Sequence, residues 1–316
     1  MDNYTHIDMP DHIKALSLRM ILSSSVSSIA PTPSLNSSPR TQSFCASQES
    51  LPDDTGSIAK MMTNARLGNK DAQAALGRMY KSGDGVPQDY HQAMTWCLKA
   101  AKQGQSHGQY TTGSLYQHAA KQGHVKAQYS LGCMYYRGRG VPQNRPWAAH
   151  WLLKAAEGGL AVAQYTLGVM YAEGRGVVQD YAQAIIWYLA AANQGHSDAQ
   201  CRLGSLYKEG SGVPQDYGQA IIWYLKAADQ GAPVGQYNIG ALYSKGRGVA
   251  LDSVLAMVWF QKAANQGFAA AQYNIGCLYE FGEGVKKDRA MALQWFKKAA
   301  EQGHSDAKEC VTRLEK

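Results

Sequence analysis

Glycine-rich loops are the first residues in this sequence whose type and spacing could do chemistry. The run RGRGV at residues 137–141 would suit a phosphate group, because closely spaced glycines expose backbone amides to an anion. However, the same G-x-G-V pattern occurs six times, always between two predicted helices and never after a strand. Phosphate-binding loops lie between a strand and a helix, so the pattern disfavours a nucleotide site.

The nine histidines are the second candidates, as metal ligands or general bases. His124, His196 and His304 share one loop position between repeats, which predicts that they lie far apart. No His or Cys pair has the spacing of metal ligands. No Ser-His-acid set or pair of carboxylates stands out either, although a dispersed triad is invisible in sequence. We therefore predict that the chain is not an enzyme, and we predict no metal and no cofactor.

The six cysteines are scattered. One lies near the N-terminus, and five lie singly in different repeats at helical positions: Cys45, and then Cys97, Cys133, Cys201, Cys277 and Cys310. Unpaired cysteines in this arrangement favour buried thiols in a reducing compartment. The expected location is the cytoplasm.

Internal repetition explains why these residues recur. The string AQYTLGVMY at 163–171 returns as GQYNIGALY at 235–243 and AQYNIGCLY at 271–279. Successive copies are 36 residues apart, except that the second and third are separated by 127 − 108 = 19. Copies begin at Ala72, Gly108, Ala127, Ala163, Ala199, Gly235, Ala271 and Ala307. A fixed period of this length predicts a stack of repeated units.

Each copy contains two segments with the apolar spacing of a helix. The first should end at a glycine in the left-handed conformation, at Gly83, Gly138, Gly174, Gly210, Gly246 or Gly282. The second should begin after an N-cap, at Asp89, Asn144, Asp180, Asp216, Asp252 or Asp288. Gln92, Gln183 and Gln219 complete capping-box patterns. Glycines such as Gly168 and alanines such as Ala184 let paired helices approach closely, and tryptophans such as Trp187 and Trp223 should be buried between helices.

The pattern A-Q-x-x-[LI]-G-x-[ML]-Y, then G-x-G-V, D-Y-x-x-A-x-x-W and K-A-A-x-x-G resembles the Sel1-like repeat family, relatives of the tetratricopeptide repeat. The resemblance covers residues 57–316. It implies an all-α, right-handed α–α superhelix whose first helices line a concave face. It also implies an adaptor role, as in ubiquitin-ligase, cell-wall-synthesis or signalling assemblies. The expected function is thus a non-enzymatic scaffold that binds a protein or peptide in the concave groove.

By the family's geometry, the third, seventh, tenth and eleventh positions of each copy face this groove. The residues predicted to contact a partner are Tyr110, Tyr129, Tyr136, Tyr165, Glu173, Lys208, Tyr237, Lys245, Tyr273 and Phe281. Tyrosine suits such a role because it offers a large contact area at low entropic cost. An alternative is that the tyrosines only shield the first helices.

Charge leaves a second function open. The chain carries +7, and residues 1–56 carry 3 − 6 = −3, so the repeats carry +10. This bias permits binding to nucleic acid or an anionic surface, although a protein partner is favoured and nucleic acid is not.

The second copy breaks the pattern, because it lacks the G-x-G-V loop, the Asp cap and the tryptophan. With no turn signal between Gln109 and Gln122, we predict one continuous helix there. Later repeats then either dock with reversed roles or follow a bend near Gly123, and we favour the bend, with a break near 117–124. A mis-assigned intron would also explain the gap.

Residues 1–55 differ from the repeats of 56–316. Residues 23–50 are rich in Ser, Pro and Thr, which predicts a disordered tail. The segment Ile13–Leu22 could form one or two amphipathic turns, but Lys14 and Arg19 interrupt it, so it does not read as a secretory signal. A transit peptide stays open. No stretch reaches the ~20 apolar residues of a membrane span.

Overall fold

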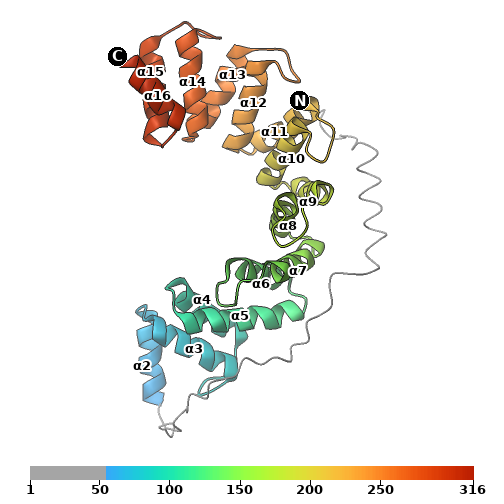
Figure 1. The fold of residues 1–316 in the computed structure, drawn as a ribbon. Helices are drawn as coiled ribbons and strands as arrows, with labels where there is room; N and C mark the ends of the chain where they lie inside the picture. The colour runs from blue at the N-terminus through green and yellow to red at the C-terminus, as the bar shows by residue number, and fades with distance from the viewer. Residues whose placement is uncertain (1–54) are drawn as a thin grey trace. The chain divides into compact units, whose positions relative to one another are not determined.

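The structure is a computed structural model that describes residues 55–316 (Figure 1). Fifteen α-helices and no strand make up this described part, which confirms the predicted all-α fold of helix-pair repeats. The helices are α2 (Thr55–Arg66), α3 (Lys70–Ser82), α4 (Tyr90–Lys102), α5 (Ser106–Lys121), α6 (Val125–Arg137), α7 (Arg145–Glu157), α8 (Ala161–Glu173), α9 (Tyr181–Asn193), α10 (Ser197–Glu209), α11 (Tyr217–Asp229), α12 (Pro233–Lys245), α13 (Ser253–Ala264), α14 (Ala269–Phe281), α15 (Arg289–Glu301) and α16 (Ser305–Leu314).

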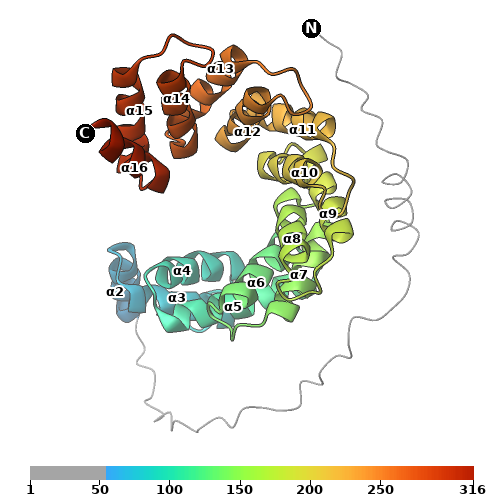
Figure 2. The same cartoon turned by 45° about the horizontal axis from the view of Figure 1, so that its top comes forward.

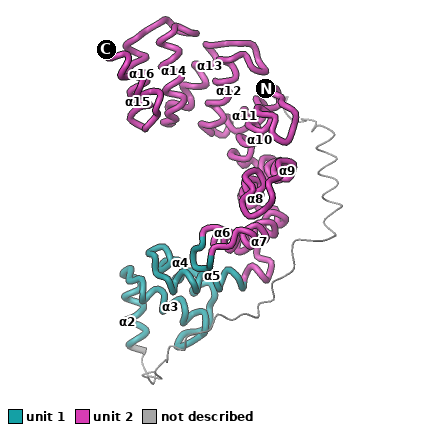
Figure 3. Tube along the Cα trace, in the orientation of Figure 1, with its two compact units in different colours: residues 1–118, 138–142 teal, residues 119–137, 143–316 magenta. Residues whose placement is uncertain are grey.

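The chain divides into two compact units (Figure 3). The first holds the described residues up to 118 together with 138–142, and the second holds 119–137 and 143–316. Helix α5 replaces a helix pair by one helix of 16 residues, as predicted for the irregular second repeat. The bend near Gly123 stays a prediction. The predicted disordered tail lies outside the described residues, apart from Thr55, which begins α2.

Within the second unit, each first helix packs against the second helix of its own repeat, and that helix packs against the next first helix. The first helices are α6, α8, α10, α12, α14 and α16. In Figure 2, α8, α10, α12 and α14 follow the inner side of the curve of this unit, whereas α9, α11, α13 and α15 follow its outer side. The free surface of the first helices therefore faces inward.

The predicted helix ends form at the same place in every full repeat. Gly210 ends α10 with φ = 73°, and the Asp216 carboxylate accepts a hydrogen bond from the amide of Gln219 at 2.9 Å. The Asp216 amide donates to the carbonyl of Tyr207 at 2.8 Å. A capping box would use that amide for the glutamine side chain, so only the aspartate half of the predicted box forms. The tyrosine carbonyl instead ties the second helix to the end of the first.

Packing between paired helices adds a second buried position next to the predicted tryptophan. The fully buried side chain is the residue after it: Tyr188, Tyr224, Phe260 and Phe296 are each 2% exposed or less. A Cβ atom on Gly168 would lie 2.7 Å from the Tyr188 ring. The glycine therefore makes room for that ring, in addition to the close approach predicted with Ala184.

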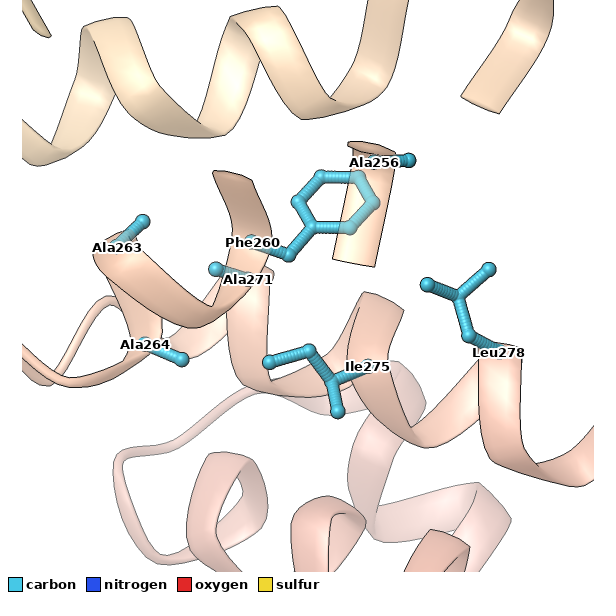
Figure 4. Packing of buried hydrophobic residues seen from close by; sticks show 7 residues of the cluster. All are labelled: Ala256, Phe260, Ala263, Ala264, Ala271, Ile275 and Leu278. Carbon is cyan, nitrogen blue, oxygen red and sulfur yellow. The ribbon is translucent and has the colours of Figure 1, made fainter. Parts of the chain in front are cut away.

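Trp223 is buried at 5% exposure as predicted, and the half-buried Trp187 packs against the core cluster formed by Ala155, Ala156, Ala163 and Leu167. Consecutive helical residues point about 100° apart, so the tryptophan and its successor cannot both face the first helix. Figure 4 shows the resulting core in a later repeat, where Phe260 of α13 lies among Ala256, Ala263, Ala264, Ala271, Ile275 and Leu278.

A buried glutamine joins successive repeats. Gln200 is 4% exposed, and its Nε2 donates to the carbonyl of Ala192 at 3.1 Å. Its Oε1 accepts from Nε2 of Gln230 at 2.8 Å. The same pair of side chains recurs in other repeats as Gln73–Gln103, Gln164–Gln194, Gln236–Gln266 and Gln272–Gln302. This glutamine clasp satisfies buried polar groups in these five repeats, a role that the sequence motif did not reveal.

Candidate protein-binding surface

Three of the tyrosines at the third position, Tyr165, Tyr237 and Tyr273, each lie between two aromatic neighbours. Tyr165 stacks on His196, with ring centroids 4.7 Å apart and planes at 19°, and it lies 5.9 Å from Tyr188. His196 is the N-cap of α10, where its Nδ1 accepts the amide of Ala199. His196 thus begins α10 and also covers Tyr165 of α8, the first helix of the preceding repeat.

The same arrangement recurs along the second unit. Tyr273 stacks on His304 at 4.7 Å, and Tyr237 lies 5.2 Å from Phe268. The Tyr129 hydroxyl is linked by hydrogen bonds to Cys133 and Thr166, and burial raises its pKa. All four predicted tyrosines of this unit's third positions are therefore half-buried junction residues, which supports a shielding role for much of each ring.

A chain of polar contacts links α6, α8 and α10. Arg175 donates to the Tyr136 hydroxyl at 3.0 Å and pairs with Glu173 at 2.6 Å. On the next helix, Arg202 is hydrogen-bonded to Tyr165 and interacts electrostatically with Glu173. The tenth position makes similar links, since Lys208 donates to Asn238 at 3.3 Å. Arg202 was not among the predicted contact residues, because the other repeats have an uncharged Ala, Thr, Ser, Asn or Cys at its position.

The last residue of the first helix varies between five repeats and is one of four residue types. These residues, here called the end row, are Arg137, Glu173, Glu209, Lys245 and Phe281. All five are exposed, and Phe281 is 64% exposed despite its apolar ring. The end row thus presents basic, acidic, acidic, basic and aromatic groups at one equivalent position. Of the predicted contact residues, it brings Glu173, Lys245 and Phe281 into one row.

Tyr110 lies in the first unit, on α5, and is 70% exposed. It lacks the aromatic cover of Tyr165, Tyr237 and Tyr273, since no aromatic ring is paired with it among the described residues. Lys81, at the tenth position of the first repeat, donates to Ser114 of α5 at 3.0 Å. In this unit too, the tenth position ties neighbouring first helices together.

The cysteines of the described residues are all free thiols. Burial raises the pKa of Cys97, Cys201 and Cys277 to about 11. A thiol is nucleophilic only as the thiolate, so these three side chains are protonated and unreactive at neutral pH. Their environment is that of core residues.

No cluster of three or more His, Cys, Asp or Glu side chains in residues 55–316 is arranged to hold a metal ion. None of the helices found there is both long and apolar enough to cross a lipid bilayer.

Antiparallel helix pairs with recurring caps, glycine contacts and glutamine clasps define a helix-pair repeat protein of the solenoid class. Six segments match the Sel1 repeat: residues 70–105, 125–160, 161–196, 197–231, 233–268 and 269–304. They make up more than half of the chain, which therefore belongs to the Sel1 repeat family. The irregular second repeat falls between the first two matched segments.

Two solved structures resemble this chain along most of its length. The protective antigen c5321 of uropathogenic Escherichia coli strains, which displays an SLR fold, is 36% identical with a TM-score of 0.59. The match covers 81% of this chain and 51% of the antigen, so this chain spans about half of that protein. A Sel1 repeat protein from Oxalobacter formigenes is 34% identical with a TM-score of 0.59, over 81% of this chain and 80% of the other. None of the curated proteins matches the sequence.

Proposed function

We propose that the chain is a non-enzymatic scaffold that binds a protein or peptide along the first-helix surface of its second unit. The end row carries this proposal, because the same exposed position holds four side-chain types of differing charge and shape across five repeats. Packing positions repeat because every junction is alike. A position that serves only as solvated surface has no need of an exposed phenylalanine, and exposed aromatic anchors are enriched at protein interfaces.

The tyrosines contribute a second layer of the proposed site. The rings of Tyr165, Tyr237 and Tyr273 contact His196, Phe268 and His304, so the position of each ring is fixed before a partner arrives. A rigid, amphipathic surface loses little entropy on binding. The free thiols favour action in a reducing compartment such as the cytoplasm.

The test is capture of partners with the full chain as bait, followed by titration of the captured partner. Phe281→Ala and Lys245→Glu should each weaken binding at least about tenfold, as expected for contact residues. Gln294→Ala, at an exposed position on the second helix α15, is the control and should bind like the parent chain.

Equal binding by the Phe281, Lys245 and control variants would rule out the end row as the site. Recovery of nucleic acid alone, with affinity that falls steeply as salt rises, would replace the scaffold proposal by the electrostatic alternative.

A further inference from the structure

The first-helix surface of the second unit is unevenly charged. From α6 to α12, the first helices and the two residues after each that belong to this unit carry a net charge of 7 − 3 = +4. The basic residues are Lys126, Arg137, Arg175, Arg202, Lys208, Lys245 and Arg247, and the acidic ones are Glu173, Asp198 and Glu209. For α14 and α16 the same count gives 3 − 5 = −2, and Arg313 pairs there with both oxygens of Glu280. The excess positive charge is therefore confined to one part of the surface, where α8, α10 and α12 follow the inner side of the curve (Figure 2).

Two arginines in this part of the surface share one carboxylate. The Nε atom of Arg175 lies 2.6 Å from the Glu173 carboxylate, and its Nη1 donates to the hydroxyl of Tyr136 at 3.0 Å. Arg202 of α10 interacts electrostatically with the same carboxylate. A guanidinium carries one positive charge and five N–H donors. Glu173 therefore neither balances the charge of both arginines nor occupies all of their donors.

Local structure does not explain the charge of Arg202. This residue lies in the middle of α10, away from the helix ends where the dipole favours one sign of charge. Its hydrogen bond to Tyr165 does not require a charge either, because Thr166 makes the equivalent bond to Tyr129 at the preceding junction. The Arg202 side chain is exposed, and arginine is enriched at protein interfaces. Its positive charge is thus available to a partner.

We propose that the partner of the scaffold presents an acidic peptide segment, and that Arg175 and Arg202 bind one of its carboxylate side chains. This inference rests on the proposed function and specifies the chemistry of the partner. A peptide carboxylate competes with Glu173 for guanidiniums, which suit bidentate binding of carboxylates. Spaced carboxylates fit a surface on which Glu173 and Glu209 interrupt the basic residues, whereas the continuous charge of a phosphate backbone is repelled at both acids.

Fluorescence anisotropy with two short labelled peptides and the full chain tests the proposal. One peptide alternates glutamate with serine, and the other has glutamine in place of each glutamate. The parent chain should bind the glutamate peptide and not the glutamine peptide. Arg175→Gln and Arg202→Asn should each weaken binding about threefold, as expected for the loss of one exposed ion pair. Asparagine occupies the position of Arg202 in the next repeat, at Asn238, so this variant keeps the fold.

Glu173→Gln gives the opposite sign. It removes the internal carboxylate that competes with the peptide, so the glutamate peptide should bind more tightly than it binds the parent chain. The matched control is Lys262→Gln, which removes one exposed positive charge on the second helix α13. The control should bind the peptide like the parent chain.

The proposal is overturned if the parent chain binds both peptides equally, or if the control loses as much affinity as the arginine variants. It is also overturned if Glu173→Gln fails to tighten binding. Tighter binding of a single-stranded oligonucleotide of the same charge as the glutamate peptide would assign this surface to nucleic acid instead.

The Phe281 and Lys245 variants test the scaffold function separately. If they weaken binding of the captured partner while Arg175→Gln and Arg202→Asn do not, the scaffold function stands and the acidic segment is wrong. If none of these variants changes the affinity for that partner, the first-helix surface is not the binding site.

Discussion

The glutamine clasp predicts a measurable difference between two chemically identical substitutions. Gln200→Met keeps the length of the side chain but removes its bonds to Ala192 and Gln230. The Ala192 carbonyl still accepts the amide of Gly195, and Gln230 is exposed enough to be solvated, so neither group is left unsatisfied. The loss is therefore two net hydrogen bonds, about 1–3 kcal/mol.

Gln128→Met is the matched control, because its repeat has Gly158 where the others have the second glutamine. Gln128 donates to Ala120 at 3.2 Å, but Gly158 has no side chain to donate in return. The expected cost is about 0.5–1.5 kcal/mol, or roughly half.

Thermal unfolding followed by circular dichroism measures both variants. A loss of about 2 kcal/mol should lower Tm by about 4–8 °C for a unit of this size. The reasoning fails if Gln200→Met melts like the parent chain, or if Gln128→Met is destabilised as much as Gln200→Met.

Three further outcomes follow from the packing. Tyr188→Ala should lower the free energy of unfolding by about 3–5 kcal/mol, because the ring is 2% exposed and fills the space beside a helical glycine. Trp187→Ala should lower it clearly less in the same urea titration. The reverse order would show that the tryptophan is the main core residue. Cys201 should react with a thiol reagent at pH 7.5 at least roughly 100-fold more slowly in the folded protein than in the unfolded chain. Burial raises the pKa of its thiol to about 11, so little thiolate forms at this pH. Fast reaction in the folded protein would contradict its burial. Arg175→Ala should change stability by less than about 1 kcal/mol, since its ion pair with Glu173 is half exposed, and a larger loss would show that the polar chain is structural.

The helix-pair fold and its boundaries could be read from the sequence because they depend on local chemistry. A left-handed residue favours glycine, as at Gly210, and an unsatisfied helix N-terminus favours a short polar side chain, as at Asp216. These preferences act within a few residues. The missing loop in the second repeat therefore predicted α5 as one helix without knowledge of its neighbours.

The packing roles depended on the tertiary structure, because they are set by what lies across each junction. Trp187 and Tyr188 are both large and aromatic, and only the direction of each side chain relative to α8 decides which fills the core. Similarly, the 30-residue separation of Gln200 and Gln230 conceals their hydrogen bond.

The candidate site was predictable in part. The sequence identified Phe281, Lys245 and Glu173 as variable positions, and the structure brings them into one exposed row. It could not show that Tyr165 is covered by His196, since stacking depends on how the next repeat docks. Sequence by itself determined the helices, their ends and their period, because these follow from short-range backbone preferences. Tertiary structure alone decided which side of each helix is buried at a junction and which remains free to bind, because burial depends on neighbours on other helices, such as Gly168 beside Tyr188 and Gln230 beside Gln200.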